Sequence, residues 1–178
     1  GIAKMANAYE KSRGGWQPAT LEGLERGGGA LISTAADLIV WNKALATGQL
    51  SAFVSAKLME PTQLNSGREL RYARGIYMDS LGKQPFWWHS GSAEGYKSLL
   101  AYFPEEKLSI AILCNSGDGT NRISFATRIY GLYAGNEAVK AAQDKPHHVS
   151  YNIDDKTLKS YTGTFITASR LRPVQLVL

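Results

Sequence analysis

The amino-acid sequence predicts an α+β fold in which an antiparallel sheet is flanked by helices. The clearest evidence is a pair of apolar runs of strand length, 97–103 and 108–114, separated only by the polar residues 104–107. A loop this short joins antiparallel neighbours. Segments with helical periodicity lie before and after the pair, near 34–47 and 121–134. We therefore expect a sheet that is buried on both faces.

The first helix is predicted from its caps as well as from its periodicity. Thr34 with Asp37 three residues later fits a capping box, although Ser33 is a rival cap. Gly48 stands where the residue after a helix end adopts positive φ. Apolar residues recur at the spacing of one helix face: Leu38, Trp41 and Leu45.

The other elements follow from similar patterns. In chain order we expect a mainly looped, Gly-rich segment over 1–32, a short helix over 51–59, a strand over 72–78, a turn over 79–83, a strand over 85–89 and a last helix ending near Ala134. The apolar stripe of the last helix is Ile123, Ala126 and Tyr130, and Gly135 closes it.

The chain is expected to form one main domain over residues 1–135. Residues 136–152 are polar, contain Pro146 and a His pair, and have the composition of a linker. Residues 153–178 include a strand pattern at 161–165 and are interpreted as the start of an appended small β domain or as a truncated tail. The last ten residues end abruptly, as truncated or vector-derived sequence would.

Composition excludes several classes of function. The net charge is +5, and Lys and Arg are scattered rather than clustered, so no nucleic-acid partner is expected. The longest clearly apolar run, 108–114, is too short for a membrane span. The single Cys114 allows no internal disulfide and is expected to be a buried, inert thiol.

No cofactor or metal is expected either. The glycine triplet 27–29 is not followed by the Gly-Lys-Ser/Thr of a phosphate-binding loop. His147 and His148 are adjacent, so they point in opposite directions in an extended segment, and no second cluster at ligand spacing accompanies them.

Three ordered stretches resemble the family of serine β-lactamases, penicillin-binding proteins and related esterases and D-aminopeptidases. They are the Gly-rich entry into a capped helix at 28–38, the motif His-Ser-Gly-Ser-Ala-Glu-Gly-Tyr at 89–96, and the strand 110–115 followed by a helix. The resemblance covers about residues 1–135 and implies the carboxy-terminal part of a β-lactamase/transpeptidase-like fold, as in class C β-lactamases. It also implies a periplasmic or extracytoplasmic location. No targeting segment is evident in the sequence that could test this expectation.

The resemblance implies acyl transfer by a serine nucleophile assisted by a lysine one helical turn later. His89-Ser90-Gly91 then stands where the family has a Lys-Thr-Gly strand motif, and the backbone N–H of Ser92 is the oxyanion donor. Independently of any family, a glycine on a strand edge permits close approach of a substrate, and a backbone N–H there can stabilise an oxyanion.

The side chains of this motif have functional and structural interpretations. Ser90 could bind a substrate carboxylate or relay a proton, and so could His89, since imidazole changes charge near neutral pH. A lone histidine beside aromatic residues is otherwise most often structural. Trp87 and Trp88 should flank the site, although packing in the strand explains at least one of them.

Two residues at the start of the last helix are the candidate substrate contacts. Asn121 and Arg122 stand near the positions at which the resemblance implies contacts to a substrate carboxylate. A merely polar surface is the competing interpretation for this pair.

The nucleophile is not evident in these 178 residues. A Ser-x-x-Lys occurs at 80–83, but it contains a glycine and lies between two strand patterns. The chemistry needs serine and lysine on one face of a helix, and no Tyr-x-Asn element is found at a credible position. We therefore expect the nucleophile to come from a missing amino-terminal half, in the same or another chain, which would also cover the exposed apolar face of the sheet.

Two functional hypotheses follow. The first is part of a serine hydrolase that acts through an acyl-serine intermediate on a small-molecule or peptide acyl substrate, namely a β-lactam, an ester or a D-amino-acid peptide. The second is a non-catalytic binding or assembly module that has kept the fold and lost the chemistry, which the lack of a nucleophile favours. Under either hypothesis the isolated chain is expected to be inactive.

Overall fold

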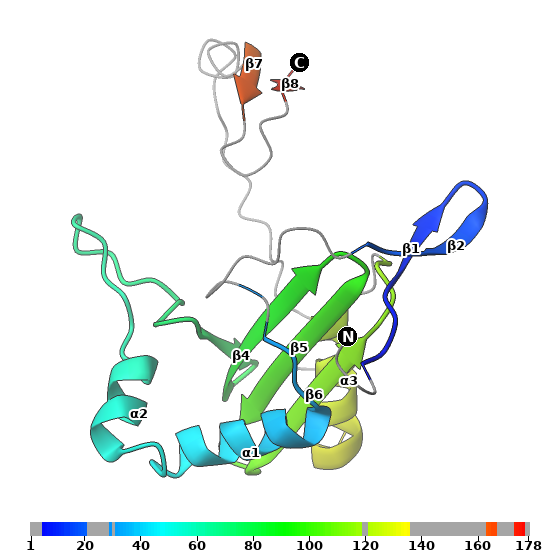
Figure 1. The fold of residues 1–178 in the computed structure, drawn as a ribbon. Helices are drawn as coiled ribbons and strands as arrows, with labels where there is room; N and C mark the ends of the chain where they lie inside the picture. The colour runs from blue at the N-terminus through cyan, green and yellow to red at the C-terminus, as the bar shows by residue number, and fades with distance from the viewer. Residues whose placement is uncertain are drawn as a thin grey trace. The chain divides into compact units, whose positions relative to one another are not determined.

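Figure 1 shows a computed structural model of the chain, which describes residues 5–20, 29, 31–118 and 121–135, and two short strands at 163–166 and 173–176. The chain divides into two compact units, Gly1–Asp144 and Lys145–Leu178. Each unit is described by itself below.

The first unit is built on a four-stranded antiparallel sheet. Its strands are β3 (Tyr77–Leu81), β4 (Gln84–Ala93), β5 (Tyr96–Phe103) and β6 (Leu108–Cys114). They pair in the order β3-β4-β5-β6, so each strand neighbours the next one along the chain (Figure 1). The predicted pair and its polar loop are therefore confirmed, and so is the α+β fold class.

Side-chain alternation divides the sheet into two faces, and a helix covers each of them. Helix α1 (Ala35–Ala46) contacts β6 and β5 on the face of Ser109, and helix α3 (Arg122–Ala134) packs on the face of Phe103. The two helices lie on opposite sides of the strands (Figure 1). The α3 face is the more deeply buried, with Leu99 only 1% exposed. On the α1 face Tyr102 is buried, Leu100 is half-buried and Leu113 is 45% exposed, so the expected burial on both faces is complete only beneath α3.

Stacked aromatic rings form the centre of the core beneath α3. Phe86 stacks on Phe103 with ring centroids 5.0 Å apart, and Phe103 stacks on Tyr130 at 4.1 Å. Tyr130 is fully buried, and its hydroxyl donates to Glu106 at 2.7 Å. Burial, together with that carboxylate, raises the pKa of Tyr130 to about 12. The phenol therefore stays neutral, as its place in the core requires.

Helix α1 begins as predicted. Thr34 is the N-cap, its hydroxyl accepts from the Asp37 N–H at 3.1 Å, and Gly48 follows the C-cap with a φ of 71°. The expected apolar face is wrong in one place, because Trp41 is 46% exposed. Asn42 is buried instead, and its amide donates to Ala101 O at 3.0 Å and to Ser109 Oγ at 2.9 Å.

Replacing Asn42 by alanine should lower the free energy of unfolding by about 2–4 kcal/mol, because the buried Ala101 carbonyl and the half-buried Ser109 hydroxyl lose their donor. Urea unfolding followed by tryptophan fluorescence measures this change. Lys43→Ala on the exposed side of the same helix is the matched control and should change the stability by less than about 0.5 kcal/mol. Equal effects of the two substitutions would contradict a structural role for the Asn42 amide.

The remaining helices also match their sequence patterns. Helix α2 (Ala52–Met59) is capped by Ser51, whose hydroxyl accepts from the Val54 N–H at 3.3 Å. Helix α3 buries Ala126 and Tyr130, with Ile123 packed against the core, and it ends at Gly135. Cys114 is a free thiol and is half-buried rather than buried.

Two expectations about the strands are corrected. Only the last two residues of the segment 72–78 belong to β3, which runs on to Leu81. The loop that closes the hairpin has only two residues, 82–83, so Leu81 pairs with Gln84. The predicted turn therefore shrinks to that loop. The strand expected at 85–89 runs on to Ala93, because Ser90 to Ala93 pair with β5.

The segment expected to be looped contains a β-hairpin, β1 (Tyr9–Ser12) with β2 (Gly15–Pro18). Tyr9 joins the hairpin to the end of β6, since its N–H donates to Asn115 O at 3.0 Å and its carbonyl accepts from Gly117 at 2.8 Å. These polar, exposed strands have little apolar alternation, which is why the sequence pattern did not predict them. Residues 5–19 therefore close the sheet at the β4–β5 turn.

The second unit contains a two-stranded antiparallel hairpin, β7 (Gly163–Ile166) with β8 (Pro173–Leu176). A strand in this part of the chain was expected at 161–165, and β7 overlaps that range. The proposed linker at 136–152 lies outside the described residues.

Candidate active site

Strand β4 continues beyond the end of its neighbour β3. The β3–β4 register ends with Tyr77 opposite Trp88, whereas β4 stays paired with β5 up to Ala93. On the β3 side, no strand among the described residues pairs with 89–93. This stretch is the predicted motif, so the structure places His89, Ser90, Gly91 and Ser92 on a free strand edge, here called the open edge.

The two hairpin loops determine which backbone groups face the open edge. Gln84 flanks the two-residue loop to β3, and Ala93 flanks the two-residue loop to β5. Residues that flank such a loop exchange both hydrogen bonds, and the bonding direction alternates along a strand. Gln84 therefore faces β3, Ala93 faces β5, and the N–H and C=O groups of Ser90 and Ser92 point toward the open edge.

Gly91 lies between these two serines, and a side chain at this position would require the Ser98 hydroxyl to move. A Cβ atom at position 91 would lie 2.4 Å from Ser98 Oγ, on the neighbouring strand. The missing side chain also leaves the strand backbone accessible next to Ser92. Ser92 itself is exposed, and its hydroxyl accepts a hydrogen bond from the ammonium group of Lys97, which is opposite it in the register.

His89 is exposed and contacts two tyrosines. Its Nε2 lies 3.1 Å from the hydroxyl of Tyr72. Its ring centroid lies 5.8 Å from that of Tyr77, with an interplanar angle of 22°. No hydrogen bond to Nδ1 occurs within the described part of the chain. The imidazole is therefore held by one nitrogen and can use the other toward a bound molecule.

The two tryptophans lie on opposite faces of β4. Trp88 stacks on Tyr77 at 4.5 Å and packs against the core, whereas Trp87 stacks on Tyr102 at 4.5 Å. Both indole N–H groups are buried without a hydrogen-bond partner. Packing in the sheet accounts for the positions of both rings, whereas the sequence interpretation needed packing to explain only one of the two.

Asn121 and Arg122 lie at the start of α3. The side-chain oxygen of Asn121 caps the helix by accepting from the Ser124 N–H at 3.1 Å. The Nε of Arg122 donates to Ser98 O at 3.3 Å, and Ser98 is opposite Gly91 in the β4–β5 register. Arg122 is thus next to the strand behind the open edge, while Asn121 serves the helix. Their role as substrate contacts stays a prediction.

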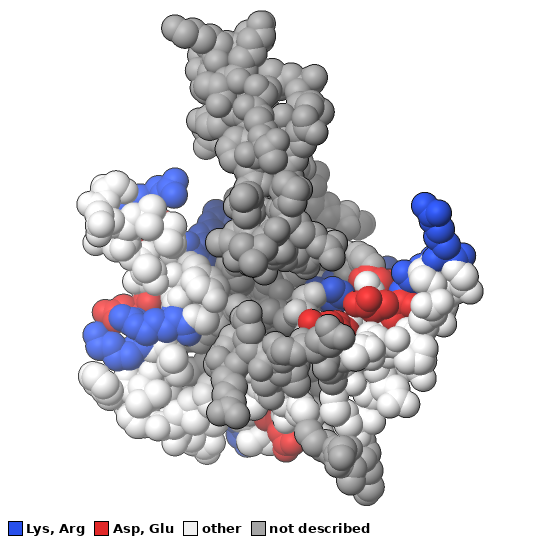
Figure 2. All heavy atoms as spheres, turned by 45° about the horizontal axis from the view of Figure 1, so that its top comes forward, with Lys and Arg blue, Asp and Glu red and all other residues white. Residues whose placement is uncertain are grey.

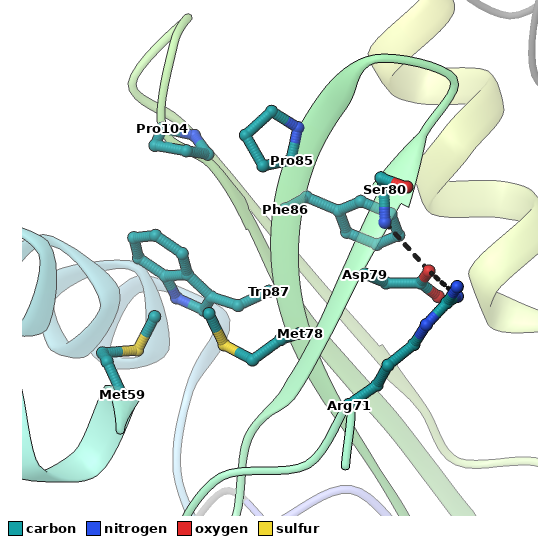
Figure 3. A pocket seen from close by; sticks show the side chains of 9 residues that line it. All are labelled: Met59, Arg71, Met78, Asp79, Ser80, Pro85, Phe86, Trp87 and Pro104. Atoms are coloured by element: carbon teal, nitrogen blue, oxygen red, sulfur yellow. Dashed lines mark hydrogen bonds and ion pairs between the residues drawn. The ribbon is translucent and has the colours of Figure 1, made fainter. Parts of the chain in front are cut away.

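The Ser-x-x-Lys sequence at 80–83 is not helical. Ser80 is on β3, and Lys83 is in the exposed loop that follows it. Ser80 lines a pocket of about 370 Å³ with Met59, Arg71, Met78, Asp79, Pro85, Phe86, Trp87 and Pro104 (Figure 3). Its backbone N–H donates to Asp79 at 2.9 Å. The lining residues Pro85 and Trp87 are on β4, at least five residues away from Ser92. At 3.4 Å per strand residue, the pocket therefore lies about 17 Å or more along the strand from Ser92.

Charges on the described surface are mixed. Figure 2 shows Lys and Arg side chains interspersed with Asp and Glu on the visible face. One cluster joins α2 to the following loop, where Glu60 contacts Lys57 at 3.1 Å and Arg74 at 2.9 Å. Hydrogen bonds from Lys57 and then Arg74 lower the pKa of the Glu60 carboxyl.

The described residues show neither a metal cluster nor a membrane-spanning helix. They contain no group of three or more His, Cys, Asp or Glu side chains that could hold a metal ion, whereas His147 and His148 lie outside this part. None of the described helices has the length and apolar character needed to cross a membrane.

Two residues near the open edge were missed by sequence reasoning. Lys97 could have been found, because a two-residue loop at 94–95 places position 97 opposite Ser92 by counting alone. Tyr72 had no such signal, since it comes from the loop between α2 and β3.

Comparison with known proteins agrees with this architecture. No curated protein matches the chain. Among solved structures, the octameric penicillin-binding protein homologue from Pyrococcus abyssi is similar, with a TM-score of 0.63 and 23% sequence identity. The match covers 73% of this chain but only 31% of that protein, so the chain spans about a third of its length. The model of the beta-lactamase family matches residues 3–132. Because this match includes the four-stranded sheet, helix α1 and nearly all of helix α3, and so more than half of the chain, the chain belongs to the beta-lactamase family.

Proposed function

We propose that this chain forms the oxyanion-side wall of a serine hydrolase that acts through an acyl-serine intermediate. The observation that supports it is the open edge, where the Ser92 N–H points away from β5 and is not used by any described strand. The substrate is proposed to be a carbonyl compound of the β-lactam, ester or D-amino-acid peptide class, which family membership favours.

In this proposal the Ser92 N–H stabilises the charge that develops on the substrate carbonyl. When a serine attacks the carbonyl carbon, the π-electron pair moves to oxygen, and a preorganised N–H at about 3 Å lowers the energy of that oxyanion. Lys97 supports the arrangement in two ways. Its hydrogen bond to Ser92 Oγ holds the side chain of Ser92, and its positive charge next to residue 92 would favour negative charge that develops near the Ser92 N–H.

His89 and Ser90 supply the polar groups beside the scissile bond. His89 is exposed on the same edge and takes the place of the family's lysine, where it can hydrogen-bond to the substrate. Ser90, two residues before Ser92, presents its backbone to the same edge. The two serines are about 7 Å apart along the strand, so one bound acyl group can contact both.

The attacking serine and its lysine are proposed to come from outside these 178 residues, in the same or another chain. Ser80 is a poor candidate because it is on a strand, with Lys83 in a turn, so the two cannot share a helix face. The open edge would then face the helix that carries the nucleophile.

Activity-based labelling tests this division of roles. The chain alone should not react with a fluorescent penicillin or a fluorophosphonate, and Ser80→Ala should change nothing. Mixed with or fused to the serine-bearing part of the same enzyme, it should give a labelled band on that part, detected by in-gel fluorescence.

Two outcomes would overturn the proposal. Labelling of the isolated chain that disappears in Ser80→Ala would place the nucleophile here after all. A folded, recombined protein that binds acyl compounds saturably without labelling or turnover would instead identify a non-catalytic binding module.

A further inference from the structure

The loop before β3 brings a tyrosine to the open edge. Residues Ala73 to Ile76 turn the chain so that Tyr72 pairs with Tyr77, with the Ala73 N–H donating to Ile76 O at 2.8 Å. The ring of Tyr72 lies edge-on to Tyr77 at 4.5 Å, and its hydroxyl reaches Nε2 of His89 at 3.1 Å. A side chain 17 positions away in the sequence thus contacts the histidine of the motif.

This loop holds Tyr72 firmly. The Tyr72 carbonyl accepts from the Thr62 N–H at 3.3 Å, and the carbonyl of the neighbouring Arg71 accepts from the Met78 N–H at 2.9 Å. Arg74, two residues later, forms an ion pair with Glu60 at 2.9 Å. Tyr72 is half-buried. The hydroxyl is therefore placed before any substrate arrives, which is what positioning requires.

The chemistry of the two groups gives the bond a direction. A phenol is a good donor, but its oxygen lone pair is partly delocalised into the ring, whereas the unprotonated nitrogen of a neutral imidazole is a good acceptor. The favoured arrangement has Tyr72 donating to Nε2. Which nitrogen of a histidine carries the proton is set by the hydrogen bond that the other nitrogen makes. The proton of neutral His89 then resides on Nδ1.

We propose that Tyr72 is a positioning residue that fixes neutral His89 with its proton on Nδ1, so that Nδ1–H is the hydrogen-bond donor offered to the acyl substrate. This inference rests on the proposed function for its substrate, but not for the Tyr72–His89 contact itself. It makes His89 a neutral donor in the place of the family's lysine, with no need for a positive charge.

Nitrogen NMR on the chain labelled at histidine tests the contact without any catalysis. The chain has three histidines, and His89→Gln assigns the relevant signals. In the spectrum of its neutral form, His89 should show a protonated Nδ1 and an unprotonated Nε2. Tyr72→Phe should shift it toward the Nε2–H form that free histidine favours. Tyr77→Phe is the matched control, because it removes a hydroxyl from the other ring beside His89 and should leave the spectrum unchanged.

Activity of the recombined enzyme gives the second readout. Asn places an N–H where Nδ1 is, and Gln places one where Nε2 is, so His89→Asn should retain at least tenfold more kcat/KM than His89→Gln. Tyr72→Phe should lower kcat/KM about tenfold in the wild-type background and should have no further effect in the His89→Asn background.

The two readouts fail separately. Identical His89 spectra in the wild type and Tyr72→Phe would overturn the positioning role, whatever the hydrolytic activity. A tautomer shift confined to Tyr72→Phe, with no turnover in any recombined variant, would sustain the contact and overturn the proposed function. Equal activity of His89→Asn and His89→Gln would show that Nδ1–H is not the donor.

Discussion

Replacing Ser92 by proline should lower kcat/KM of the recombined enzyme by about 100- to 1000-fold, the range found when one oxyanion donor is removed. Proline has no backbone N–H, so this change deletes the proposed donor while keeping the strand. The measurement is the steady-state hydrolysis of a chromogenic ester or β-lactam. Because the donor acts mainly on the transition state, the loss should fall on kcat more than on KM.

Because Ser92 is on the open edge, this substitution should remove the donor without destabilising the sheet. Proline in a central strand breaks a ladder hydrogen bond, but on an edge whose N–H faces outward it removes none. The hairpin geometry assigns that outward direction to Ser92, since Ala93 next to it bonds to β5. The melting temperature should therefore change by only a few degrees, which separates loss of the donor from loss of the fold.

Ser92→Ala is the matched control. It keeps the backbone N–H and removes only the hydroxyl that accepts from Lys97, so activity should fall by less than about tenfold. If Ser92→Ala and Ser92→Pro were equally impaired, the side chain rather than the backbone would be the functional group. If both were fully active, the oxyanion donor would lie elsewhere.

Most of the sheet could be predicted because its signals are local. The apolar run 108–114 and the polar loop before it indicate a hairpin by themselves, and β5 and β6 confirm it. The caps of α1 were predictable for the same reason, because Thr34 and Gly48 act within one turn of the helix ends. Such features need no knowledge of distant residues.

The errors concern features decided by distant contacts. Trp41 and Asn42 are adjacent, and periodicity favoured the apolar one for burial. The buried position instead belongs to Asn42, because Ser109 and the Ala101 carbonyl need a donor there. Tertiary hydrogen bonding overrides hydrophobic pattern when a polar group of the sheet faces the helix.

The candidate site was predicted in the same uneven way. The motif at 89–92 came from resemblance, and the structure adds that it lies on an unpaired edge, which sequence could not show because it depends on where β3 ends. Tyr72 could not be predicted at all. Its distance to His89 depends on how the loop after α2 folds back, and no local pattern encodes this.

The closure of the sheet by residues 5–19 depends on one glycine, and Gly95→Ala should lower the free energy of unfolding by about 3–5 kcal/mol. Gly95 has a φ of 70°, which costs a residue with a side chain about 1–2 kcal/mol. A Cβ atom there would also lie 2.8 Å from the Tyr9 nitrogen and 2.9 Å from the Ala8 Cβ. Real Cβ contacts are not this short, so the segment must move or the turn must open.

Gly75→Ala separates the two causes of this loss. Gly75 has a similar φ of 80°, but nothing lies within 4 Å of a Cβ atom at that position. It should therefore cost only the backbone part, about 1–2 kcal/mol, in the same urea titration, and the difference from Gly95→Ala measures the clash. Hydrogen exchange gives the location, because only Gly95→Ala should release the amides of residues 8–19 and 115–117, which Tyr9 joins. Equal costs in the two variants would mean that backbone strain alone accounts for Gly95, and that residues 5–19 do not close this end of the sheet next to Ser92.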